Sequence, residues 1–75
     1  MKNYDFTAYI EKDKTTGLYF GHVPHLQGAH TQGATLDELH KNLLEVISLC
    51  LEEISSEEKE ELNDFVGMQK VSVSV

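Results

Sequence analysis

Apolar and polar residues alternate along the first stretch of the chain, residues 4–11 (YDFTAYIE). A period of two is typical of a strand with one buried face. Four apolar side chains should share that face: Tyr4, Phe6, Ala8 and Ile10. A polar loop ending at Gly17 follows, and residues 18–23 (LYFGHV) favour a second strand because they are rich in aromatic and β-branched residues. Pro24 cannot donate a ladder hydrogen bond, so this strand should end before it.

A short third strand is expected over residues 29–32 (AHTQ), between two glycines. Gly28 closes the turn that precedes it, and Gly33 permits a positive φ angle ahead of the next element. Three consecutive strands joined by short turns predict an antiparallel meander.

The spacing of apolar residues then changes from two to three and four, which predicts an amphipathic helix ending near Ile54. Thr35 and Glu38 fit a capping box at its start. The buried stripe should contain Leu36, Leu39, Leu43, Ile47, Cys50, Leu51 and Ile54. Leu49 falls outside the stripe, either as an isolated surface leucine or as part of a subunit contact.

Beyond this helix, residues 55–66 read as a second short helix or as a solvated linker. Residues 69–75 (QKVSVSV) alternate and predict a fourth strand. The element order β-β-β-α-β predicts a single α+β domain over residues 1–75, with the helix packed on one sheet face. The other face, around Tyr9 and Tyr19, should be open. A second copy or another protein would cover it, together with the bare edge of the last strand.

Composition narrows the class of partner. Thirteen Asp and Glu residues face six Lys and no Arg, giving a net charge of −7. This balance argues against nucleic acid as a direct ligand and suits a basic partner. A chain of 75 residues has a marginal core, so we expect self-association. Cys50 has no possible cystine partner, and no apolar run could span a bilayer, so we expect a cytoplasmic protein without a membrane segment.

Candidate chemistry is sparse. His22, His25 and His30 could in principle bind zinc, but they fall on different predicted elements and scattered surface histidines are the stronger reading. His40 lies within the apolar arc of the helix and should be packed, and Cys50 should be a core thiol rather than a nucleophile. The predicted inward strand positions carry no carboxylate pair for Mg²⁺, so we expect neither an enzyme nor a cofactor.

The segment from Gly17 to Glu38 resembles the HicB antitoxin family, and more closely its short single-domain members. The chain carries V-P-x-L-x-G at residues 23–28 and T-Q-G-x-T-x-x-E at residues 31–38, in the family's order and spacing. The resemblance implies a reduced ribonuclease H-like β-β-β-α-β fold without the nuclease carboxylates. It covers residues 4 to about 54 well.

The same resemblance implies an antitoxin that binds a small basic HicA-type mRNA-cleaving toxin and masks its RNA-binding surface, assembled as a homodimer or homotetramer. Many relatives carry an added DNA-binding domain, which we do not expect in this chain. Glu11, Asp13 and Tyr19 are the candidate contact residues. Two alternatives are an orphan oligomeric module with another protein partner and a histidine-based metal-binding domain.

Overall fold

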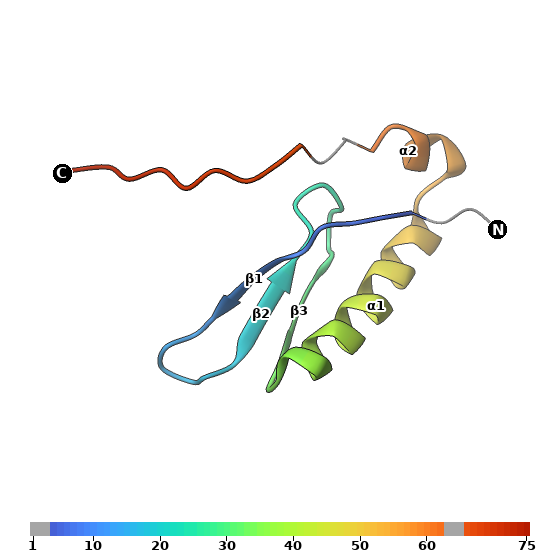
Figure 1. Cartoon of the computed structure of the whole chain (residues 1–75). Coiled ribbons are helices and arrows are strands. Elements are labelled where there is room, and N and C mark those ends of the chain that lie inside the picture. Colours follow the sequence, from blue (N-terminus) through green and yellow to red (C-terminus); the bar gives the residue numbers. More distant parts are fainter. Residues whose placement is uncertain (1–3, 63–65) are drawn as a thin grey trace.

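A computed structural model describes residues 4–62 and 66–75 of the chain. Three short strands, β1 (Tyr9–Lys12), β2 (Tyr19–His22) and β3 (His30–Gly33), precede a long helix, α1 (Leu36–Glu53), and a short one, α2 (Ser56–Glu60). Figure 1 shows the strands side by side, α1 lying along them, and residues 66–75 extending apart from both. The α+β class is therefore confirmed, as are the three-stranded meander and the main helix.

The sheet has the strand order β1-β2-β3, with both pairs antiparallel. Ile10 pairs with Gly21, which pairs in turn with Thr31. In the β1–β2 loop the Asp13 backbone N–H donates to the Leu18 carbonyl at 2.8 Å. Gly17 adopts a φ angle of 76° in this loop, a conformation that favours glycine. The turn between β2 and β3 ends at Gly28, whose φ angle is 85°, as its predicted role requires.

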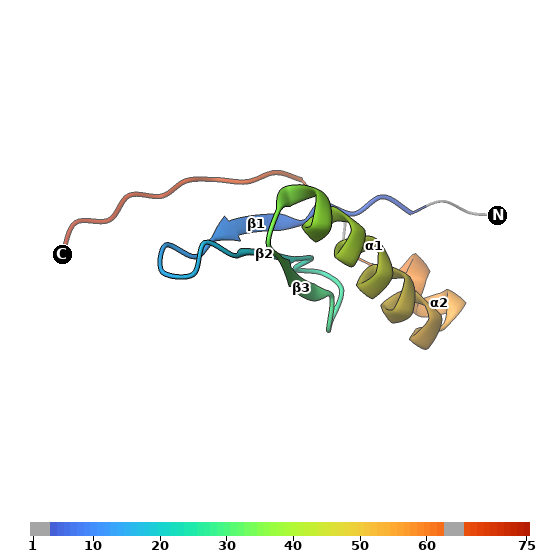
Figure 2. The same cartoon turned by 90° about the horizontal axis from the view of Figure 1, so that it is seen from below.

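Helix α1 covers one face of the sheet, over β2 and β3 (Figure 2). Leu39 is completely buried there, and Leu43 is buried beside it. The helix comes close because two strand positions on this face are glycines. A Cβ on Gly21 would lie 3.3 Å from the Leu39 and Leu43 side chains, and one on Gly33 would lie 2.6 Å from the Leu39 backbone nitrogen.

A second apolar cluster lies under the β2–β3 turn. Its buried members are Val23, Leu26 and Ala29. Partly buried side chains from the N-terminal segment, the C-terminal half of α1 and the end of α2 pack against it: Phe6, Ala8, Ile47, Cys50, Ile54 and Leu62. The predicted packing of Cys50 in the core is confirmed in this half-buried form. The cluster fixes the turn that separates β2 from β3.

The predicted fourth strand is not present among the described residues. Residues 66–75 are assigned no strand and are exposed throughout. Alternation of Val and Ser defines which side chains share a face, but a strand exists only when its backbone groups find a neighbour. No strand of the described sheet pairs with this segment, because the sheet contains β1, β2 and β3 alone.

Three further predictions were wrong for reasons of packing. Gly33 does not adopt a positive φ angle, and it is glycine because the α1 backbone lies against it. His40 is exposed and lines a shallow pocket with Phe6 and Ala8 of the N-terminal segment. Ile10 is 51% exposed because α1 covers β2 and β3 without reaching over β1. Of the two readings of residues 55–66, the short helix is confirmed over Ser56–Glu60, and residues 63–65 lie outside the described residues.

Thr35 caps α1 as predicted, with its hydroxyl oxygen accepting from the Glu38 backbone N–H at 3.1 Å. We expect Thr35→Ala to lower the free energy of unfolding by about 1 kcal/mol, because one N-terminal N–H loses its acceptor. Thr35→Ser keeps the acceptor and should be nearly neutral. Urea unfolding followed by circular dichroism measures both changes.

Ser55 provides the matched control, since it caps α2 with the same geometry at 3.1 Å. Helix α2 buries none of its residues, so its fraying exposes little apolar surface. Ser55→Ala should therefore change global stability by less than about 0.5 kcal/mol. Equal losses at Thr35 and Ser55 would contradict this reading of the two helices.

Candidate functional site

The face of the sheet opposite α1 carries a continuous set of large side chains. Side chains alternate between faces along a strand, and Gly21 and Gly33 lie under α1. The positions next to those glycines therefore point to the opposite side. The register places them in two rows across the strands, Glu11–Phe20–Gln32 and Tyr9–His22–His30. We call this set of six residues the open face.

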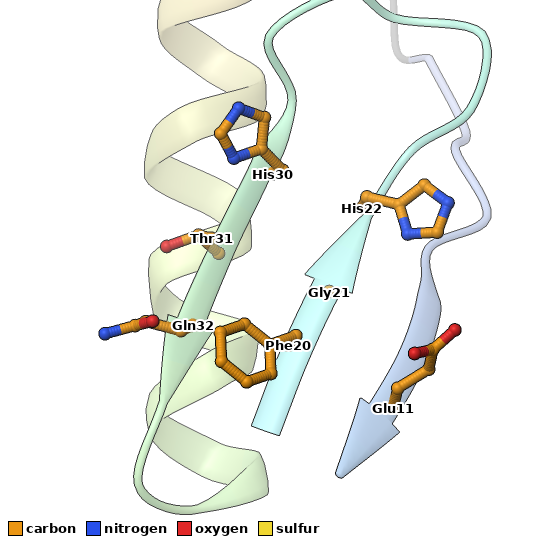
Figure 3. Close-up of a pocket in the computed structure, with 7 residues that line it drawn as sticks. All are labelled: Glu11, Phe20, Gly21, His22, His30, Thr31 and Gln32. Carbon is orange, nitrogen blue, oxygen red and sulfur yellow. The ribbon is translucent and has the colours of Figure 1, made fainter. Parts of the chain in front are cut away.

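The open face contains a shallow pocket. Figure 3 shows the residues that line it, with α1 behind the strands. Glu11, Phe20, Gln32 and the two histidines of the second row line it. The Tyr9 and His22 rings meet across β1 and β2, with their centroids 5.5 Å apart. Aromatic surface next to hydrogen-bonding groups is the composition of protein contact surfaces.

The three predicted contact residues do not share one surface. Glu11 lies on the open face and lines the pocket. Tyr19 has the parity of Gly21 and so lies on the α1 side of the sheet, where the Lys12 ammonium sits 5.4 Å from its ring centroid. Asp13 is in the β1–β2 loop, where its carboxylate accepts from the Thr15 backbone N–H at 2.8 Å. That hydrogen bond holds the pKa of Asp13 below its ordinary value.

Phe20 occupies the position on the open face that the sequence reading gave to Tyr19. Its side chain is 40% exposed, a large fraction for an aromatic ring on a strand. Both residues fit the predicted strand, and choosing between them requires knowing which face α1 covers. Gly21 indicates which face α1 covers, because a glycine within a strand often marks a close approach by another backbone.

The structure brings together two of the three histidines considered for zinc. His22 and His30 are directly paired across β2 and β3, whereas His25 lies in the turn beyond the strand ends. Within residues 4–62 and 66–75, no group of three or more His, Cys, Asp or Glu side chains is placed to hold a metal ion. The histidine pair contributes hydrogen-bonding capacity to the open face.

The open face itself carries one carboxylate, that of Glu11. Most of the other acids occupy the loops and the two helices, and they give the chain its net charge of −7. This charge would attract a basic molecule to the protein as a whole. Neither helix in the described part of the chain is both long and apolar enough to cross a membrane.

Comparison with known proteins places the chain among small bacterial and archaeal proteins. A UPF0150 protein of Synechocystis sp. is 48% identical over 73 residues, which cover 97% of this chain and 100% of that protein. UPF0150 proteins of Thermotoga maritima and Archaeoglobus fulgidus are 43% and 44% identical over 68 residues, covering 91% of this chain and 88% and 93% of their own lengths. No family profile and no solved structure matches the chain. Identity at this level over nearly the full length shows that the chain belongs to the UPF0150 family.

Proposed function

We propose that this UPF0150 protein is a HicB-like antitoxin that neutralises a small, basic HicA-type mRNA-cleaving toxin by covering the toxin's RNA-binding surface. The motifs at residues 23–28 and 31–38 support the family assignment, since they have the order and spacing of HicB proteins. On this proposal the observed meander and helix are the main part of a reduced ribonuclease H-like domain.

One structural observation supports binding over catalysis: the sheet is covered on one face only. The open face combines the aromatic rings of Tyr9 and Phe20 with His22, His30, Gln32 and a carboxylate from Glu11. A masking antitoxin needs a complementary surface and no reactive group. An enzyme that cleaves RNA with metal ions needs clustered carboxylates instead.

Charge supplies the second argument. A toxin that binds RNA needs a positively charged surface, because RNA binding rests on phosphate contacts. A partner with a net charge of −7 is attracted to that surface and competes there with RNA. Direct RNA or DNA binding by this chain is unfavourable for the same reason. We further propose that the protein acts in the cytoplasm and self-associates, as its small core requires.

The proposal is tested by purifying the tagged protein from its own host at low salt and identifying what accompanies it by mass spectrometry. We expect a stoichiometric, small, basic protein encoded next to this one, toxic when expressed alone and harmless when both are present. Recovery of the tagged protein alone would contradict the antitoxin proposal and favour an orphan module. Stoichiometric zinc in the purified protein would instead favour the histidine-based alternative.

Affinity for that companion should depend on the open face. We expect Phe20→Ala to weaken binding about 30-fold, the loss of roughly 2 kcal/mol that is typical of a central aromatic contact. Tyr19→Ala removes a ring from the neighbouring position on the opposite face and should change the affinity less than threefold. Isothermal titration calorimetry measures both.

Glu11→Gln tests the charge contribution, because it keeps the shape of the side chain and removes its charge. It should slow association and reduce the salt dependence of binding more than it raises the dissociation rate. A larger loss for Tyr19→Ala than for Phe20→Ala would show that the partner binds the other side of the sheet.

A further inference from the structure

The segment of residues 66–75 has the pattern of a strand and lacks a strand's neighbour. Its large apolar side chains are more exposed than those of the rest of the chain: Val66, Met68, Val71, Val73 and Val75. Figure 1 shows the segment apart from the three strands, and no described strand pairs with it. The radius of gyration is 14.3 Å, against about 11 Å for a compact chain of this length. Exposed apolar side chains on a strand-like segment of this kind indicate that another protein surface buries them.

The sheet has one edge suited to receive it. β3 is an edge strand as well, but the Asn42 side-chain amide of α1 donates to the Gln32 carbonyl at 2.8 Å, so the helix occupies part of that edge. β1 has β2 as its single neighbour. β1 itself spans four residues, and residues 4–8 lead into it without strand pairing. As one continuous strand, residues 4–12 would form an edge about 30 Å long. The ten residues from 66 to 75 match this length.

The faces of the segment match the faces of that edge. On the α1 side of the sheet, Ile10 is 51% exposed and continues the row that begins with Phe6 and Ala8. Val71, Val73 and Val75 would extend this row as an apolar surface. Ser72 and Ser74 would then lie on the open face beside Glu11. Over residues 71–75, one register parity therefore places apolar side chains beside the apolar row on the α1 side and polar side chains beside Glu11 on the open face. Val66 and Met68 have the parity of the serines and would lie on the open face as well.

We infer that residues 66–75 add as a strand to the β1 edge of a second copy of this chain. Residues 66–75 of the second copy add in the same way to β1 of the first. The segment does not lie on its own β1, although that edge is part of the same molecule. A reciprocal exchange pairs two segments and two edges in one closed, twofold-symmetric contact. It would also join the two sheets and place two open faces in one assembly. The inference rests on the self-association proposed above and is independent of the antitoxin role.

Paired cysteines test the exchange directly. In a Cys50→Ala background, one copy carries Ile10→Cys and a second, differently tagged copy carries Val73→Cys, and the two are co-expressed and mildly oxidised. Directly opposed residues of neighbouring strands have the Cα separation that a disulfide needs. We expect a disulfide-linked dimer on non-reducing gels, with Val71→Cys and Val75→Cys bracketing the register.

Ser72→Cys and Ser74→Cys are the matched controls, because the same backbone would carry their thiols on the other face, and neither should cross-link to Ile10→Cys. Cross-linking of the serine positions equal to that of the valine positions would overturn the proposed facing. A disulfide formed within single chains that carry both cysteines, with none between copies, would show that the segment returns to its own β1. No disulfide at any of the three valine positions would overturn the strand addition altogether.

Light scattering of the unmodified protein distinguishes a failure of strand exchange from a failure of self-association. A monomer at micromolar concentration would overturn both self-association and exchange, while leaving toxin binding to be judged by the calorimetry above. A dimer or tetramer without cross-linking at the valine positions would overturn the exchange alone.

Discussion

Replacing Gly33 with alanine should lower the free energy of unfolding by about 3 kcal/mol, one of the two largest effects we expect from a single substitution. The added Cβ would lie 2.6 Å from the Leu39 backbone nitrogen and 2.9 Å from its Cα atom. Backbone atoms cannot rotate away as a side chain can, so α1 must move off β3. A chain of 75 residues has a total stability of only about 4–11 kcal/mol, so the variant should lose between about a quarter and three quarters of its stability.

Gly21→Ala and Gly67→Ala provide graded controls for this effect. A Cβ on Gly21 would meet the methyl groups of Leu39 and Leu43 at 3.3 Å, which small side-chain shifts can relieve, so we expect a loss of about 1 kcal/mol. A Cβ on Gly67 would meet nothing within 4 Å and should change stability little. Urea unfolding at one fixed protein concentration ranks the three variants. Similar stability of the Gly33 and Gly67 variants would refute the close approach of α1.

The elements that rest on local signals were predictable from the sequence. Helix α1 runs from Leu36 to Glu53 as its three- and four-residue spacing and its Thr35 cap predicted. The first strand followed from alternation, the second from its aromatic and β-branched residues, and the third from its place between Gly28 and Gly33. In each case the side chain that decides the structure lies within a few residues of the backbone that it affects.

The predictions that were wrong concern features that depend on which elements pack together in the folded protein. Alternation in residues 69–75 predicted a strand but could not supply the neighbour that a strand needs. The open face was expected, but it was assigned to Tyr19 instead of Phe20 because the side covered by α1 is a tertiary property. His40 fell inside the predicted arc, yet the helix packs on Leu39 and Leu43 and leaves His40 exposed. The open face was therefore predictable as a surface. Tyr9 and Glu11 lie on it as expected, and Tyr19 does not.

Leu39→Ala should be at least as damaging as Gly33→Ala, because Leu39 is 0% exposed and joins α1 to both β2 and β3. Truncation of a fully buried leucine costs about 2–5 kcal/mol, the lost burial plus the cavity left behind. We expect about 4 kcal/mol, since the glycines at positions 21 and 33 leave no side chain that could move in to fill the space. The midpoint of urea unfolding measures the loss, and a change below 1 kcal/mol would show that α1 does not anchor the sheet.

Leu49→Ala is the matched control, with the same chemistry on the same helix at a site that is 60% exposed. In a monomer it should change the stability by less than about 0.5 kcal/mol. Leu49 fell outside the predicted stripe, and a subunit contact there would make its loss depend on protein concentration. Unfolding both variants at two concentrations, 100-fold apart, therefore answers two questions. A constant loss for Leu39→Ala places that residue in the core of each copy, and a loss for Leu49→Ala that grows with concentration places Leu49 between copies.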